Sequence, residues 1–325
     1  MTRRRVRTAI ATLLLAAGLL VALAQPAAAS PGAYQVLFAK GEDSCEGDTG
    51  LQTQLAAMPH VAKVDVFDTS SGTPSVAQLD PYDMVVTMSD SDGYADQDAL
   101  GNNLADYADH GGVVVQYAFS MQSGSFALAG RWLSGGYAPY VPGSNSDTDV
   151  TLGEHDAASP LIAGVNSLVS QGCNTDPTLA PGATRVAQWN NGLEAIALKG
   201  QAVAVNAGIE DTSCGWSGDF ARLTYNAMTF LTPPYGTSVS KKKIKPKKHT
   251  ARFEFSASGN VAGFECSLSR SKKKKKKGKK SAAPFSACAS PKLYKHLKSG
   301  RYTFKVRATN AHGPDATPAT KKFKI

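Results

Sequence analysis

The chain has 325 residues, of which 42% are hydrophobic, and its formal net charge is +9. That modest value hides two regions of opposite sign: residues 30–240 carry 6 Lys and Arg against 23 Asp and Glu, a net charge of −17, and residues 241–325 carry 25 against 3, a net charge of +22. The split excludes a uniformly basic protein and suggests that electrostatics selects the partner, because a dense charge of one sign acts over about a Debye length, ~8 Å at physiological salt.

A secretory signal peptide is predicted at residues 1–29. Four arginines near the start precede an apolar run from Ala9 to Leu23, and the small residues Ala27–Ala29 form a cleavage site before Ser30. The apolar run is shorter than the ~20 residues of a membrane-spanning helix, and no second run follows. We therefore expect a secreted protein, extracellular or associated with the cell envelope, without a membrane span after cleavage. The paired arginines resemble a twin-arginine signal but the residues after them depart from it, so the export route stays open.

Residues 30–236 are predicted to form one α/β domain. Short apolar runs predict strands at residues 34–39, 61–67, 83–88, 113–118 and 201–206. Leucines recur at helical spacing from Leu51 and again from Leu100, which predicts a helix after the first strand and another after the third. The second helix should end at His110, because the glycines that follow can adopt the left-handed turn that ends helices. Alternating strands and helices predict a flavodoxin-like, doubly wound, mostly parallel sheet.

The order of these motifs resembles the class I glutamine amidotransferase-like fold, in particular its ThuA-like branch. The resemblance covers most of residues 33–232. Four segments carry it: Tyr82–Val86, Leu104–Val115, Ser159–Val165 and Arg222–Ala227.

The chain departs from that family at its catalytic positions. The resemblance implies a cysteine in a Gly-x-Cys-x-Gly turn after the fourth strand, where a helix N-terminus lowers the thiol pKa. Tyr117–Gln122 contains neither the cysteine nor the glycines, and no histidine occurs in Ala207–Asp211, where the catalytic histidine would follow the last strand. Ser120 also lacks the glycines of a nucleophile elbow. We therefore expect no catalytic residue, no cofactor and no metal, and the sequence favours a non-catalytic domain over an enzyme.

A ligand site could still lie at the carboxyl ends of the strands, where open α/β sheets bind ligands. The loops at this edge are expected to place eight polar or aromatic residues there: Glu42, Asp43, Asp90, Asp92, Gln116, Ser120, Glu210 and Trp216. Carboxylates beside an aromatic ring could bind a sugar or surround a cation, although no complete calcium-binding loop is present. The simpler interpretation is a solvated acidic rim.

Five cysteines in an exported chain indicate disulfides rather than thiol chemistry. Cys266 and Cys288 are expected to pair with each other in the basic region. Among the three cysteines of the acidic region we expect Cys173 to pair with Cys214, which leaves Cys45 without an assigned partner.

The basic region is predicted to begin with a Lys-rich, extended linker at residues 237–249, because dense like charge repels itself. Alternation of apolar and polar residues then predicts an all-β sandwich over residues 250–325, as at Phe253 and Phe255 and along Tyr302–Ala308. A disulfide would stabilise so small a sandwich.

This segment resembles the bacterial Ig-like repeat of secreted actinobacterial proteins. The carrying residues are Phe264–Leu268, Pro284–Cys288, Leu297–Gly300, Tyr302–Asn310 and Thr317–Ala319. Where the repeat has a tight hairpin between its cysteine-bearing strands, the chain has a Lys-rich insertion at residues 271–281. We expect eight lysines of this insertion to bind polyanions: Lys272, Lys273, Lys274, Lys275, Lys276, Lys277, Lys279 and Lys280.

The sequence thus favours a secreted, non-catalytic binding or adhesion protein of the cell envelope, in which the Lys-rich module contacts an anionic cell-wall polymer or another polyanion. Lysine attracts phosphate without reading bases, and arginine, which suits bidentate phosphate contacts, is rare in the module. The alternative is a hydrolase or carbohydrate-active enzyme with an atypical site at the carboxyl edge of the α/β sheet. A solubilising insertion in a spacer domain and an intramolecular contact between the acidic and basic modules also stay open.

Overall fold

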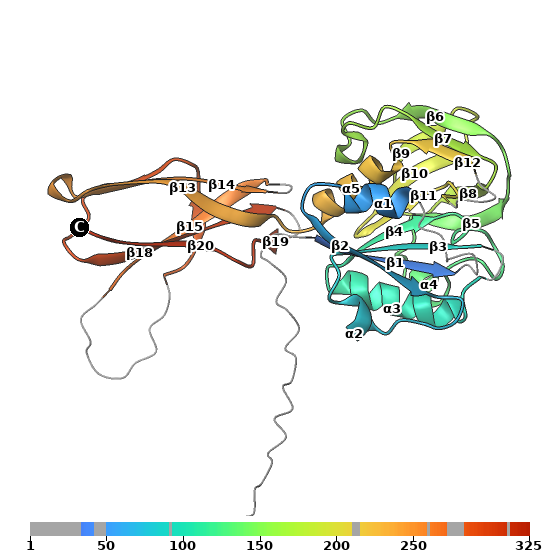
Figure 1. Cartoon of the computed structure of the whole chain (residues 1–325), viewed down its shortest axis with the longest axis horizontal. Coiled ribbons are helices and arrows are strands. Elements are labelled where there is room, and N and C mark those ends of the chain that lie inside the picture. Colours follow the sequence, from blue (N-terminus) through green and yellow to red (C-terminus); the bar gives the residue numbers. More distant parts are fainter. Residues whose placement is uncertain are drawn as a thin grey trace, which may run out of the picture. The chain divides into compact units, whose positions relative to one another are not determined.

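The computed structural model describes residues 34–41, 50–90, 93–209, 215–258, 261–271, 283–310 and 313–325 (Figure 1). The predicted signal peptide lies outside the described residues. So do all eight lysines of the predicted insertion.

A ten-stranded sheet, in the order β12-β7-β6-β9-β10-β11-β4-β3-β1-β2, forms the centre of the acidic region. One half is parallel and consists of β1 (Tyr34–Gly41), β2 (Val61–Asp68), β3 (Met84–Ser89), β4 (Val113–Tyr117) and β11 (Ala202–Val205). The predicted strands are therefore confirmed, with small differences at their ends. In β3, β4 and β11 every residue is buried, because both faces of this half are covered.

The other half of the sheet is antiparallel. It consists of β6 (Val150–His155), β7 (Leu168–Gln171), β9 (Thr184–Trp189), β10 (Glu194–Lys199) and β12 (Gly215–Gly218). A separate two-stranded sheet pairs β5 (Tyr140–Asn145) with β8 (Thr175–Leu179).

The predicted flavodoxin-like, doubly wound, mostly parallel sheet is therefore wrong. Among the described residues 46% lie in strands and 18% in helices, and the large sheet is mixed. The physical reason lies in two tight turns, at Gly192 between β9 and β10 and at Gly200 between β10 and β11, where φ is +89° and +56°. Such turns join neighbouring strands as antiparallel hairpins, whereas a parallel pair needs a long crossover connection.

Helices cover both faces of the parallel half (Figure 1). On one face α1 (Gly50–Ala56) and α5 (Phe220–Leu231) pack against alternate residues of the strands, such as Phe38 and Val115. On the other face lie α3 (Gln97–Asp109) and α4 (Gly130–Ser134), which pack against residues such as Leu37 and Val114. The remaining helices are short: α2 (Val76–Leu79) and the 3-10 turn η1 (Pro160–Ile162).

Residues 235–325, called the β-module below, form two antiparallel sheets. The first contains β13 (Tyr235–Lys245), β14 (Thr250–Ser258) and β17 (Lys292–Tyr294). The second contains β15 (Gly263–Arg270), β16 (Ser286–Cys288), β18 (Arg301–Asn310), β19 (Gly313–Pro314) and β20 (Ala319–Lys324). Phe253 of the first sheet stacks on Phe304 of the second, with ring centroids 4.0 Å apart, so the core lies between the sheets. The predicted Cys266–Cys288 disulfide is confirmed and joins β15 to β16.

The segment predicted as an extended linker at residues 237–249 is instead structured. Up to Lys245 it belongs to β13, which pairs with β14 along its length, and Pro246–Lys248 form a 3-10 turn, η2. Val239 and Ile244 pack against the module core while the lysines around them stay exposed. Like charges are tolerated here because an edge strand holds their side chains in solvent, so charge density alone did not identify a linker.

Candidate functional site

Gln116 and Ser120, expected at the carboxyl edge of the sheet, are both enclosed by the protein, with 3% and 0% of their surfaces exposed. Gln116 Nε2 donates to the Ser120 carbonyl oxygen at 2.9 Å, and Gln116 Oε1 accepts from Trp132 Nε1 at 3.0 Å. The Ser120 hydroxyl donates to the Tyr117 carbonyl oxygen. The side chains of Gln116 and Ser120 therefore form hydrogen bonds inside the protein, and neither is accessible to a ligand.

Asp90 and Trp216 lie in different parts of the acidic region. Asp90 follows β3, where its backbone N–H donates to the Gly41 carbonyl at 3.0 Å. Trp216 belongs to β12, which five strands separate from β4, and its ring meets Phe220 edge-on with centroids 5.8 Å apart. The structure does not bring Trp216 together with Gln116. The other four predicted ligand residues lie outside the described residues: Glu42, Asp43, Asp92 and Glu210.

A buried group of hydroxyls occupies the carboxyl ends of β3 and β4, and sequence reasoning missed it. Thr87 Oγ1 lies 2.9 Å from Tyr94 Oη, and the Ser89 hydroxyl donates to the Phe126 carbonyl at 2.7 Å. Burial raises the pKa of Tyr94 far above its ordinary value, so this phenol stays protonated. The available signal was the spacing of Thr87 and Ser89, which share one face of an otherwise apolar strand.

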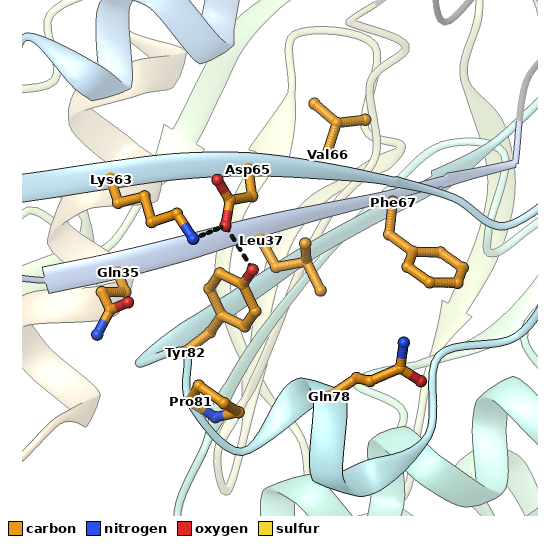
Figure 2. Close-up of a pocket in the computed structure, with 9 residues that line it drawn as sticks. All are labelled: Gln35, Leu37, Lys63, Asp65, Val66, Phe67, Gln78, Pro81 and Tyr82. Carbon is orange, nitrogen blue, oxygen red and sulfur yellow. Dashed lines mark hydrogen bonds and ion pairs between the residues drawn. The ribbon is translucent and has the colours of Figure 1, made fainter. Parts of the chain in front are cut away.

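A hollow of about 480 Å³ opens over β1 and β2, on the face that also carries α3 (Figure 2). We call it the Tyr82 hollow, and nine residues line it: Gln35, Leu37, Lys63, Asp65, Val66, Phe67, Gln78, Pro81 and Tyr82. It exists because the connection from β2 to β3 contains only the four-residue helix α2, too short to cover the edge of the sheet. Sequence reasoning treated these positions only as strand and loop residues.

One carboxylate organises the polar side of the Tyr82 hollow. Tyr82 Oη donates to Asp65 Oδ2 at 2.5 Å, and Lys63 Nζ forms an ion pair with the same oxygen. Burial acts to raise the pKa of Asp65, but the hydrogen bonds from Lys63 and Tyr82 outweigh it and the pKa is lowered. Burial and the neighbouring carboxylate together raise the pKa of Tyr82. At neutral pH the site thus holds a carboxylate, an ammonium and a protonated phenol.

A second candidate site is the adjoining edges of the two sheets in the β-module. Among the described strands, β13 pairs only with β14 and β20 only with β18, and β13 lies beside β20. These two strands carry seven exposed lysines, called the lysine edge below: Lys241, Lys242, Lys243, Lys245, Lys321, Lys322 and Lys324. The sequence interpretation missed the lysine edge because it assigned residues 237–249 to a linker.

The lysine edge has no counter-charge within the described β-module. The module contains three carboxylates, and two of them pair with arginines: Glu254 with Arg252 and Glu265 with Arg307. The third, Asp315, is buried and accepts a hydrogen bond from the Thr237 backbone at 2.8 Å. No described lysine of β13 or β20 forms an ion pair with a described carboxylate, so their positive field is available to a ligand.

Within the described ranges, no three His, Cys, Asp or Glu side chains are grouped so that they could hold a metal ion. The described helices also include none that is long and apolar enough to cross a membrane. Cys173 is disulfide-bonded, but Cys45 and Cys214 lie outside the described residues, so the Cys173–Cys214 pairing stays a prediction.

Structural comparison finds weak likenesses to solved proteins. A cytoplasmic protein of Salmonella typhimurium is 14% identical over 60% of this chain and 98% of its own, with a TM-score of 0.48. A glutamine amidotransferase from Thermotoga maritima is 17% identical over 53% of this chain and 74% of its own, with a TM-score of 0.41. The C-terminal part is similar to a human fibronectin type III domain, at 18% identity over 29% of this chain and 82% of that domain, with a TM-score of 0.18.

No protein-family model matches the chain, and no curated protein sequence matches it. The likenesses above are too weak to carry an argument about function.

Proposed function

We propose that the chain is an exported, non-catalytic binding protein of the cell envelope that holds anionic polymers through its β-module. The observation that carries the proposal is the lysine edge, whose seven exposed side chains lie on two adjoining strands while every carboxylate of the module is engaged elsewhere. Export is supported by the signal-like residues 1–29 and by the Cys266–Cys288 disulfide, because disulfides persist in oxidising compartments.

The chemistry of the lysine edge suits a repeated anionic polymer. An ammonium group is a compact point charge that attracts phosphate, sulfate or carboxylate without demanding a particular geometry. A row of such charges gains affinity by releasing counterions from a polyanion, and that gain falls as the salt concentration rises. Lysines also protect sheet edges from pairing with other chains. Protection needs only a few charges, whereas here β13 carries four lysines within residues 241–245 and β20 carries three within residues 321–324.

The test is elution of the purified protein from immobilised wall teichoic acid, a polyphosphate, and from polygalacturonate, a polyuronate. We expect the triple variant K321Q/K322Q/K324Q to elute at lower salt than the parent. The matched control is K292Q/K295Q/K298Q, which removes the same charge from β17 and the segment after it. Equal shifts for both variants would show that net charge, rather than the lysine edge, holds the polymer.

A variant that lacks residues 272–280 distinguishes the contribution of the lysine edge to polymer binding from that of the predicted insertion. If the edge is sufficient, the deletion variant should keep most of its salt resistance on the same columns. Complete loss of retention would assign binding to the insertion instead.

The enzyme alternative has no supporting geometry among the described residues. The side chains of Gln116 and Ser120 form their hydrogen bonds with groups inside the protein.

A further inference from the structure

We propose that the Tyr82 hollow is a binding site for a neutral saccharide, separate from the lysine edge and independent of polyanion binding. Its volume of about 480 Å³ falls in the range of small-molecule sites, about 300–1,000 Å³. The hollow lies beside residues that precede β3 and extends along β2 from Lys63 to Phe67.

Two aromatic rings give the hollow its apolar surfaces. Figure 2 shows Leu37 between the rings of Tyr82 and Phe67, and Leu37 is paired in register with Asp65 on the neighbouring strand. Aromatic rings carry a negative face, which attracts the polarised C–H groups on one side of a sugar ring. A flat apolar surface bordered by polar groups therefore matches a pyranose, whose C–H face and hydroxyl rim have the same arrangement.

Tyr82 is fixed in place before any ligand binds. Its backbone N–H donates to the Leu79 carbonyl at 2.9 Å, and its own carbonyl accepts from Tyr107 Oη at 2.9 Å. Its hydroxyl donates to Asp65. With backbone and ring both held, little conformational entropy remains to be lost when a ligand packs against the ring.

Hydrogen-bonding groups around the hollow remain available for hydroxyls. Tyr82 and Lys63 both contact Asp65 Oδ2, and no described group donates to Asp65 Oδ1. Gln78 Oε1 accepts from the Ser75 backbone and hydroxyl at 3.0 and 2.8 Å, which leaves Gln78 Nε2 without a described acceptor. The backbone N–H of Gln35 donates to Asp83 Oδ2 at 2.8 Å, but the side-chain amide of Gln35, which lines the hollow, has no described partner. A carboxylate oxygen and amide groups are the acceptors and donors that hydroxyls require.

The charges of the site favour a neutral ligand over a charged one. Lys63 and Asp65 neutralise each other, while the surrounding acidic region, with its net charge of −17 from 6 cations and 23 anions, repels anions. A cationic ligand is opposed by Lys63, whose Nζ lies 5.6 Å from the Tyr82 ring centroid and thus already occupies the cation–π position.

The experiment is isothermal titration calorimetry of the purified protein with cellobiose, maltose, mannobiose and chitobiose, and with glucuronate and glucosamine as charged counterparts. We expect saturable binding of at least one neutral disaccharide and weaker binding of the charged sugars. Absence of binding for every neutral disaccharide, or tighter binding of a charged sugar, would overturn the proposal.

Variants then place the site. Y82A and F67A should weaken binding of that disaccharide by about tenfold, because each removes one ring surface. Y82F keeps the ring and should keep most of the affinity, provided that its melting curve shows a folded protein. The matched control is L293A, because Leu293 is similarly exposed, at 47%, but lies on β17 of the β-module and does not line the hollow. Equal weakening by L293A, or no weakening by F67A and Y82A, would contradict a site at the two rings.

The two proposals can fail separately. K321Q/K322Q/K324Q should leave saccharide binding unchanged, and F67A should leave elution from teichoic acid unchanged.

Discussion

Asp315 is a carboxylate enclosed by the β-module, with 2% of its surface exposed. Backbone N–H groups of Thr237 and Thr317 donate to it at 2.8 and 2.7 Å. Burial acts to raise the pKa of Asp315, but these hydrogen bonds and those from the threonine hydroxyls outweigh it, so the pKa lies below its ordinary value. The Asp315 side chain thereby connects Thr237, near the start of β13, with Thr317, in the segment before β20.

The β-module should lose stability in acid through this residue. A carboxyl whose pKa is lower in the folded chain stabilises the fold above its unfolded pKa, about 3.9, and the contribution disappears as pH falls through the folded pKa. D315N should be less stable than the parent at neutral pH and should lose less stability on acidification. Urea unfolding followed at a series of pH values measures this difference. Parallel pH profiles for the two proteins would assign the acid sensitivity to other carboxylates.

Gly101 allows α3 and α4 to approach each other closely. A Cβ atom at this position would lie 2.1 Å from the Ala129 carbonyl oxygen, which is backbone and cannot rotate away. G101A should therefore lower the free energy of unfolding by about 1–3 kcal/mol. The control is G72A, because a Cβ at Gly72 meets nothing within 4 Å. Thermal denaturation of both variants decides whether this contact is as tight as the structure indicates.

At the scale of elements, the disulfide is the main covalent support of the second sheet in the β-module. Cys266 and Cys288 are 22 residues apart in sequence. Closing a loop of that length restricts the unfolded chain, so C266A/C288A should lower the free energy of unfolding by about 3 kcal/mol. Denaturant unfolding of the double variant measures the loss, with reduced parent protein as a second comparison. A loss below about 1 kcal/mol would mean that the hydrophobic core alone holds β15 against β16.

Strands that consist of an uninterrupted run of apolar residues could be predicted from the sequence. Uninterrupted apolar runs such as Val113–Tyr117 identify strands buried on both faces. The topology could not be predicted in the same way, because Gly192 and Gly200 reverse the chain with local turns that apolar periodicity does not report. β13 was missed because its run of lysines obscured the apolar residues Val239 and Ile244.

The candidate sites were harder to predict than the strands. Gln116 was placed at the correct end of β4, but its hydrogen bond with Trp132 is a contact across 16 residues that no local pattern predicts. The Tyr82 hollow depends on the absence of a long helix after β2, and Tyr82 and Asp65 meet only once β3 has folded beside β1. The lysine edge likewise requires β13 and β20 to adjoin in space.

At the scale of the whole molecule, the affinity for a polyanion should depend steeply on salt. Each neutralised anionic group releases a counterion and contributes roughly 0.7–0.9 to the slope of log K against log salt concentration. K321Q/K322Q/K324Q should therefore reduce that slope by roughly 2–3. Titration of teichoic acid at several salt concentrations provides the slopes. An unchanged slope would mean that these three lysines do not touch the polymer.

The expected attraction between the acidic and basic regions of the chain stays a prediction.

Under the export proposed above, the pairing of β13 with β14 also bears on resistance to extracellular proteases. Trypsin-like proteases cleave after lysine, but they need several residues of unpaired backbone to enter their active site. The backbone of residues 241–245 is instead paired with β14. We therefore expect the lysines of residues 241–245 to be exposed to solvent and yet protected from cleavage while the sheet is folded. A linker of the same composition would be cut first, separating the acidic region from the β-module, whereas a strand keeps the two on one polypeptide for as long as the sheet stays folded.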